Sequence, residues 1–192
     1  PNHDEPRVAR QSENWYTRNP WWHQQWFDRI KDLIDQYHPD LLYSDGPVPF
    51  GKYGLGIIAH HYNSHAALND GERLAVYTQK NRYPGVFKVG VLDMERNVER
   101  DIVPYPWQTD TGVGGWFYDV RKAYKTSAQV IEMLVDIVAK NGNMLLNFPQ
   151  RPDGTLDDEC LSILEDMAAW NAVNAEAIYE TRPWHVGMEG ET

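Results

Sequence analysis

The sequence is poor in cysteine: Cys160 is the only one in 192 residues. A single thiol excludes an internal disulfide and a metal site built from cysteines, and it says little about the redox compartment. Long apolar runs are also missing, and no stretch is long enough to cross a membrane. Basic residues are in the minority, because 18 Lys and Arg face 28 Asp and Glu, for a net charge of −10. This balance argues against a nucleic-acid partner, which would be bound through cations.

Length sets a further limit. A chain of 192 residues can form one domain with a real core, but a complete (β/α)8 barrel typically needs ~250 residues. No signal peptide is visible, and residue 1 resembles the middle of a longer chain. Aromatic residues, in contrast, are abundant, with 8 Trp and 11 Tyr. Such rings stack on sugar faces, but they also fill the rims of barrels.

Helical and strand patterns alternate along the chain. Residues 1–18 are polar and without periodicity, so a loop or frayed end is expected there. Asn19-Pro20 predicts the start of a helix, and His38-Pro39 predicts its end. Further helices are predicted over residues 57–69, 126–140 and 157–170. The second of these starts with the capping-box pattern of Thr126 and Gln129, and Asp157 is expected to cap the third. Strands are predicted over residues 41–44, 74–78, 87–92 and 143–148, and loops over residues 46–56 and 93–119. Strands that alternate with helices favour an α/β fold with a parallel sheet.

The first candidate for chemistry is Asp45, which follows Leu41, Leu42, Tyr43 and Ser44 and precedes Gly46-Pro47. The pattern predicts a short buried strand that ends at a turn. Asp45 would then lie at the carboxyl end of the strand, where α/β barrels have their active sites. Tyr43, two positions earlier, points to the same side. On this stretch alone, an Asp that only starts a turn is the simpler interpretation.

More motifs follow in a definite order. Tyr37-His38-Pro39 precedes the strand that ends in Asp45-Gly46, and later motifs continue to the end of the chain. They are Asn81-Arg82-Tyr83, Asp93-Met94-Glu95-Arg96, Pro106-Trp107-Gln108-Thr109-Asp110, Gly115-Trp116-Phe117-Tyr118, Gly142-Asn143-Met144-Leu145-Leu146-Asn147-Phe148 and Thr181-Arg182-Pro183-Trp184. In order and spacing, this set resembles the family 29 glycoside hydrolases, the α-L-fucosidases. The resemblance covers nearly the whole chain from about Trp21 onward.

The resemblance implies both a fold and a reaction. The fold would be a (β/α)8 TIM-like barrel of the α/β class, here a partial barrel with about half the strands, and residues 1–192 would form the C-terminal part of the catalytic domain. The reaction would be retaining hydrolysis of terminal α-L-fucosyl linkages in fucosylated oligosaccharides or glycoconjugates, without cofactor or metal. A secreted, periplasmic or lysosomal location would follow.

Two alternatives stay open at this point. The family's N-terminal His-His-Asp stretch, which binds fucose hydroxyls, has no equivalent here. His60-His61 is not that stretch, because it comes after the strand that ends in Asp45. The chain could therefore be a non-catalytic carbohydrate-binding or incomplete form of such an enzyme. The other alternative is a barrel hydrolase that acts on a different glycoside.

Retaining hydrolysis needs two carboxyl groups ~5–5.5 Å apart, one as nucleophile and one as acid and then base. By resemblance, Asp45 is the nucleophile, and backbone N–H groups around Gly46 are expected to favour its ionised form. Glu95 falls near the family's acid/base. The loop that carries Glu95 varies in length within the family, so Glu99 is a second candidate for the acid/base. The simpler interpretation of Glu95 is a surface residue that forms an ion pair with a neighbouring Arg.

Three residues are expected to bind the sugar. Arg82 matches the arginine of the family's Asn-Asp-Arg-Trp stretch, although Asn81-Arg82-Tyr83 lacks the Asp and has Tyr in place of Trp. The Arg82 guanidinium is a rigid fork of N–H donors that can bind sugar hydroxyl groups. Tyr43 would line one side of the sugar site, and Trp116 resembles the aromatic residue that packs against the fucose methyl. The alternatives are a surface salt bridge for Arg82 and a core position for Trp116.

His61 and His65 have the i, i+4 spacing of two metal ligands on one helix. No Glu-x-x-His frame surrounds them, so ordinary, partly exposed histidines are the preferred interpretation, and no metal site is expected.

A partial barrel would leave an open sheet edge and apolar side chains that face the missing half. Such a surface predicts self-association as a homo-oligomer, or dependence on a complementing N-terminal half. The side chains concerned are Leu41, Tyr43, Val89, Val91, Leu145 and Phe148.

Overall fold

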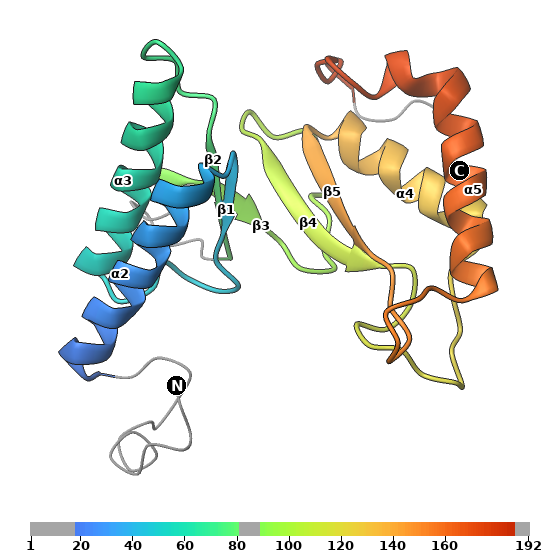
Figure 1. Cartoon of the computed structure of the whole chain (residues 1–192). Coiled ribbons are helices and arrows are strands. Elements are labelled where there is room, and N and C mark those ends of the chain that lie inside the picture. Colours follow the sequence, from blue (N-terminus) through green and yellow to red (C-terminus); the bar gives the residue numbers. More distant parts are fainter. Residues whose placement is uncertain (1–17, 81–88, 187–192) are drawn as a thin grey trace. The chain divides into compact units, whose positions relative to one another are not determined.

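The computed structural model of the chain describes residues 18–80 and 89–186 (Figure 1). The chain divides into two compact units, with the division between Leu92 and Asp93. In each unit the paired strands run parallel and helices connect or flank them. The prediction of an α/β fold with parallel strands is thereby confirmed.

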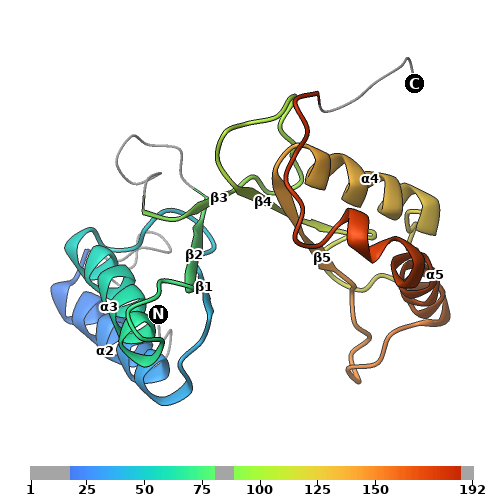
Figure 2. The same ribbon diagram turned by 90° about the horizontal axis from the view of Figure 1, so that it is seen from above.

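The first unit contains helices α2 (Pro20–Tyr37) and α3 (Lys52–Leu68), which pack against each other, and strands β1 (Leu41–Tyr43) and β2 (Val76–Gln79) (Figures 1 and 2). Strand β3 (Val91–Asp93) contributes its first two residues to this unit, and its last residue, Asp93, belongs to the second unit. Helix α2 begins as predicted, because the Asn19 side chain accepts the Trp21 N–H at 3.0 Å and Pro20 occupies the first turn. It ends at His38, whose φ of 46° is left-handed.

Strand register in this unit fixes which residues lie side by side. Tyr43 of β1 pairs with Thr78 of β2, and Thr78 pairs with Val91 of β3. Buried apolar side chains from the helices, from β2 and from the residue before β2 lie in the core of the unit. They are Ile34, Ile57, Ile58, Ala75 and Tyr77.

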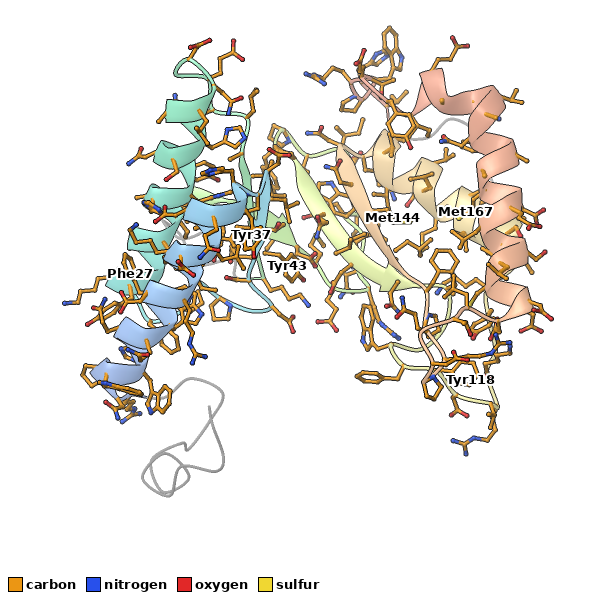
Figure 3. All side chains as sticks on the ribbon, in the orientation of Figure 1. Phe27, Tyr37, Tyr43, Tyr118, Met144 and Met167 are labelled. Carbon is orange, nitrogen blue, oxygen red and sulfur yellow. The ribbon has the colours of Figure 1, made fainter. Side chains whose placement is uncertain are left out.

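The second unit contains strands β4 (Trp107–Gly112) and β5 (Gly142–Asn147), helices α4 (Ser127–Ala139) and α5 (Asp158–Asn174), and a 3-10 turn (Ala175–Ala177). Helix α4 starts with the predicted capping box of Thr126 and Gln129. Figure 3 shows Met144 and Met167 between β5 and the two helices. The core there is formed by Val113, Val130, Cys160 and Ile163, with Met144, Leu146, Phe148, Leu156, Met167 and Tyr124 packed around it.

One correction concerns the predicted loop at residues 46–56. Helix α3 begins at Lys52, inside that range. The glycines that suggested a loop serve helix packing instead. A Cβ on Gly54 would lie 2.1 Å from the Pro49 carbonyl oxygen, and a Cβ on Gly56 would lie 3.1 Å from the Phe27 ring. At Gly54 a side chain would collide with the backbone, so the start of the helix needs glycine there, whereas Gly56 leaves room for the Phe27 ring.

The prediction of an irregular segment over residues 93–119 is also wrong in part, since β4 lies within it. Its sequence, Trp-Gln-Thr-Asp-Thr-Gly, has no apolar alternation that would mark a strand. Trp107 is fully buried, and its ring occupies the space where Gly142 on β5 has no side chain. Tertiary packing, rather than local pattern, therefore makes this segment a strand.

A third correction concerns the apolar side chains expected to face a missing half barrel. Phe148 packs on the core of the second unit together with Met144 and Leu146. Leu145 is 51% exposed, consistent with the alternation of β5, and Leu41 is 50% exposed. The exposed apolar set is therefore smaller than predicted.

Candidate active site

Asp45 lies at the carboxyl end of β1, as predicted. Ser44 N–H donates to the Thr78 carbonyl at 2.9 Å, and the Tyr77 hydroxyl donates to Ser44 Oγ at 2.8 Å. These bonds attach the end of β1 to β2. The Asp45 side chain remains 83% exposed, so the carboxylate is held at a fixed strand end but is open to solvent.

Lys80, which the sequence reasoning missed, is the ion-pair partner of Asp45. Its Nζ lies 2.8 Å from Asp45 Oδ1, and its side chain is only 14% exposed. The Lys80 N–H donates to the Gly46 carbonyl at 2.8 Å, and its ammonium lies 5.8 Å from the centre of the Tyr43 ring. The Gly46 N–H, which was expected to support the carboxylate, donates to the Ser44 carbonyl instead. Lys80, Asp45 and Tyr43 thus form one cluster.

In the second unit, Glu95 lies on an exposed turn that follows β3. Its backbone N–H donates to Asp93 Oδ1 at 2.9 Å, and its carbonyl accepts from Asn97 Nδ2 at 2.8 Å. The next residue, Arg96, has a left-handed φ of 55° and donates its N–H to the Asp110 carbonyl at 2.8 Å. The turn that carries Glu95 is therefore fixed to β4. Glu99, the competing acid/base candidate, lies four residues further along and is half-buried.

Asp93 anchors this turn and forms a carboxyl pair with Asp110. Asp93 is 2% exposed and accepts from Gln108 Nε2 at 2.5 Å and from the Asp110 N–H at 3.4 Å. Burial and the neighbouring Asp110 carboxyl raise the pKa of Asp93 to about 6, against the opposing effect of the Gln108 and Glu95 donors. The sequence did not predict this pair, because Asp110 lies in β4, within a segment that was predicted to be a loop.

The raised pKa predicts that the stability of the second unit depends on pH. Between pH 3.8 and about 6 the folded state binds more protons at Asp93 than the unfolded state, so the free energy of unfolding falls as pH rises through this window. Asp93→Asn should remove this fall, since an amide does not titrate, and its oxygen can still accept the Glu95 N–H. Urea unfolding at pH 4.5 and 7.5 measures the change in the free energy of unfolding, with substitution of the exposed Asp119 (Asp119→Asn) as control. The same pH difference in Asp93→Asn as in wild type would contradict the assignment.

Trp116 contacts Arg96, whose guanidinium carbon lies 4.4 Å from the centre of the ring. Arg96 Nη2 also donates to the Gly114 carbonyl at 3.4 Å, and Asn147 Nδ2 donates to the Trp116 carbonyl at 3.3 Å. Trp116 is half-buried, so it is neither a fully buried core residue nor a free surface ring. One face of its ring is in contact with the guanidinium, in the geometry of a cation–π interaction.

The two histidines on α3 are buried, not partly exposed as predicted. His61 Nε2 lies 3.1 Å from the Val76 carbonyl, and burial lowers the pKa of His61. His65 Nε2 lies 3.1 Å from Asp40 Oδ1, and Asn69 Nδ2 lies 3.1 Å from its Nδ1. Both imidazoles thus connect α3 to neighbouring segments. Arg82, the remaining sugar-binding candidate, lies outside the described residues.

Comparison with known proteins decides the family. The model of the alpha-L-fucosidase family matches residues 2–176. The chain belongs to the alpha-L-fucosidase family. Two curated fucosidases are similar over 81% of the chain: plasma alpha-L-fucosidase of Pongo abelii, 28% identical over 167 residues, and that of Homo sapiens, 27% identical over 177 residues. The chain spans only 35% and 34% of their lengths, or about a third.

Solved fucosidase structures share the fold. One alpha-L-fucosidase superimposes with a TM-score of 0.74 at 27% identity, over 87% of this chain and 37% of its own. The Thermotoga maritima alpha-fucosidase in complex with fucose gives 0.70 at 26% identity, and its complex with a mechanism-based inhibitor gives 0.72 at 25% identity, both over 88% of this chain. They cover 37% and 38% of the Thermotoga chain.

These similarities establish the fold class that the sequence predicted. The chain is an α/β protein with the fold of a partial TIM-like barrel from a fucosidase catalytic domain. In the parts of the chain that the structure describes, every helix is too short or too polar to cross a lipid bilayer.

Proposed function

We propose that this chain carries the catalytic carboxylates of a retaining α-L-fucosidase, which hydrolyses terminal α-L-fucosyl linkages of glycans. One observation supports the proposal most: Asp45 lies directly beyond a parallel strand of a fucosidase-family fold, exposed and held by an ion pair. In α/β barrels, catalytic residues come from the carboxyl ends of the strands. The fucose complex and the inhibitor complex of the Thermotoga relative support the same substrate class for this chain.

The reaction would have two displacements. Asp45 attacks the anomeric carbon of the fucosyl group, the bond from that carbon to the leaving oxygen breaks, and Glu95 gives its proton to that oxygen. Water then attacks the same carbon while Glu95 takes a proton from it. The bond to Asp45 breaks, and the electron pair returns to its carboxylate. The two inversions together give retention of configuration.

Three side chains are proposed to hold the sugar. The Tyr43 ring lies beside the Asp45–Lys80 pair and would wall the fucose. Trp116 would offer the fucose methyl the ring face that Arg96 does not cover. Arg82 would donate to sugar hydroxyls. The reaction calls for no cofactor or metal from these residues, since carboxylates supply both nucleophile and proton.

Covalent trapping tests the proposal on the 192-residue chain. Incubation with 2-deoxy-2-fluoro-fucosyl fluoride should add one fluorofucosyl group. The fluorine at C2 slows both steps, but the good fluoride leaving group keeps formation of the intermediate faster than its breakdown, so the intermediate accumulates. Peptide mass spectrometry should locate the group on Asp45, and Asp45→Asn should take none. A label on Glu95, Glu99 or another carboxylate would refute the assignment of the nucleophile.

A non-catalytic carbohydrate-binding role is the second candidate, because the chain spans about a third of its curated relatives. Calorimetric titration with L-fucose separates the two: binding without labelling or turnover supports the second candidate. The partner expected for the exposed apolar residues, such as Leu41 and Leu145, is a second copy or a complementing N-terminal half of the barrel. A secreted or lysosomal location is proposed from the plasma and tissue enzymes among the relatives.

A further inference from the structure

Strand register places Lys80 beside Asp45. Tyr43 on β1 pairs with Thr78 on β2, and Asp45 and Lys80 each lie two residues beyond that pair. Beyond the strands, two backbone bonds keep the segments together: Ser44 N–H donates to the Thr78 carbonyl at 2.9 Å, and Lys80 N–H donates to the Gly46 carbonyl at 2.8 Å. The 2.8 Å ion pair between Asp45 and Lys80 therefore lies where the backbone itself holds the two segments side by side.

The two partners of the ion pair differ in freedom. Lys80 is 14% exposed, and its backbone N–H is bound to the Gly46 carbonyl, whereas the Asp45 side chain is 83% exposed. The low exposure shows that the Lys80 side chain is packed against the protein, and packing restricts the rotamers of a side chain. A fixed ammonium thus meets a carboxylate that a ligand can still reach. Ordinary surface pairs, with two mobile partners, contribute little.

The pair also distinguishes the two oxygens of Asp45. The ammonium lies at Oδ1, and Oδ2 is the other carboxylate oxygen. A nucleophilic carboxylate needs one oxygen directed at the anomeric carbon, while a donor to the second oxygen restricts rotation of the group. The cation also lies where negative charge returns when the glycosyl-enzyme ester is broken.

We propose that Lys80 is the positioning residue of Asp45: it binds Oδ1, leaves Oδ2 to form the bond to the anomeric carbon, and stabilises the carboxylate as that bond breaks. The inference rests on the proposed function. In the first step the carboxylate becomes a neutral ester, and Lys80 donates to its carbonyl oxygen Oδ1. In the second step water forms the new bond to the anomeric carbon, and the ester electron pair returns to the carboxylate beside the ammonium.

This role predicts an unequal effect on the two steps. Removal of the ammonium weakens the leaving ability of the carboxylate, so breakdown of the intermediate should be slowed more than its formation. A merely structural role for Lys80 would not separate the two rates. Lys52 provides a matched control, because its ammonium also lies over an aromatic ring of the first unit, 5.2 Å from the centre of Tyr53.

The experiment measures both rates with 2-deoxy-2-fluoro-fucosyl fluoride and intact-mass spectrometry. In Lys80→Met, loss of the label from Asp45 should be slower than in wild type by about 10- to 100-fold, somewhat less than for an enclosed oxyanion site because Asp45 is exposed. The rate of labelling should change less. Lys80→Arg should recover part of the loss of label, and Lys52→Met should match wild type. Equal rates of label loss in Lys80→Met and wild type would overturn the inference.

Failure of the proposed function is recognised separately. If the wild-type chain takes no label, the proposed function fails, and the Asp45 side-chain carboxyl carbon resonance then decides whether Lys80 positions that group. Lys80→Met should shift this resonance and Lys52→Met should leave it in place. An unshifted resonance in Lys80→Met overturns the inference even then.

Discussion

Replacement of Asp157 by alanine is expected to lower the free energy of unfolding by about 3 kcal/mol, at the lower end of the range for a broken buried ion pair. Asp157 is 2% exposed and caps α5, where its Oδ1 accepts the Cys160 N–H at 2.9 Å. Its Oδ2 accepts from the Tyr124 hydroxyl at 2.9 Å and forms an ion pair with Lys122. Alanine leaves all three donors without this acceptor, two of them on the segment between β4 and α4.

The pH dependence of the same group has a definite sign. Burial alone would raise the pKa of Asp157, but the bonds from Lys122, the Cys160 N–H and Tyr124 together hold it well below its usual value. The stability it contributes is therefore present above pH 3.8, its unfolded value, and is lost as pH falls further. This window lies below that of Asp93, so the two groups can be told apart in one pH series.

Thermal or urea unfolding of three variants checks the prediction. Asp157→Asn should lose less free energy of unfolding than Asp157→Ala, because Asn is as good an N-cap as Asp. Part of the loss should remain, because Asn carries no charge to pair with Lys122. Asp119→Ala is the control, since it removes an ion pair with Arg121 in which both side chains are exposed, 48% and 85%, and it should change nothing measurable. If Asp157→Ala unfolds like this control, the buried ion pair is not what holds the segment.

The helices could be predicted because their signals are local. Asn19, Thr126 and Asp157 mark helix starts through side-chain bonds to residues two or three positions away, and all three caps are present in the structure. The start of α3 could not be predicted, since Gly54 and Gly56 are explained only by contacts with Pro49 and Phe27. Strand β4 was missed for the same reason: partners distant in sequence make it a strand.

The candidate site divides along the same line. Asp45 was found because a strand pattern ended in Asp-Gly, and the structure places it where the pattern predicted. Lys80 was missed, because its position next to Asp45 depends on the pairing of Tyr43 with Thr78, and no local sequence pattern shows that pairing. Likewise, Asp93 and Asp110 become a carboxyl pair only once β4 lies beside the Glu95 turn. Single residues at strand ends were predictable, whereas their partners were not.

The glycine variant of Asp45 should abolish hydrolysis of an aryl α-L-fucoside, with a loss of about 10⁴- to 10⁶-fold in kcat, as expected when a nucleophile is removed. Asp45 is 83% exposed and contributes one ion pair at a strand end, so its loss should leave the fold intact. Circular dichroism and the melting temperature of the variant check this point. Activity and stability are thereby separated, unlike at Asp157.

External azide makes the prediction for Asp45 specific. In Asp45→Gly the missing side chain leaves room for a small anion, and azide should attack the anomeric carbon directly. Because only one displacement then occurs, the product should be the fucosyl azide of inverted configuration, identified by its proton coupling constant in NMR. Glu95→Gly provides the contrast, since the nucleophile is still present and azide should give the retained azide through the covalent intermediate. A retained azide from Asp45→Gly would show that another carboxylate attacks the sugar, and Asp45 would lose its assignment as the nucleophile.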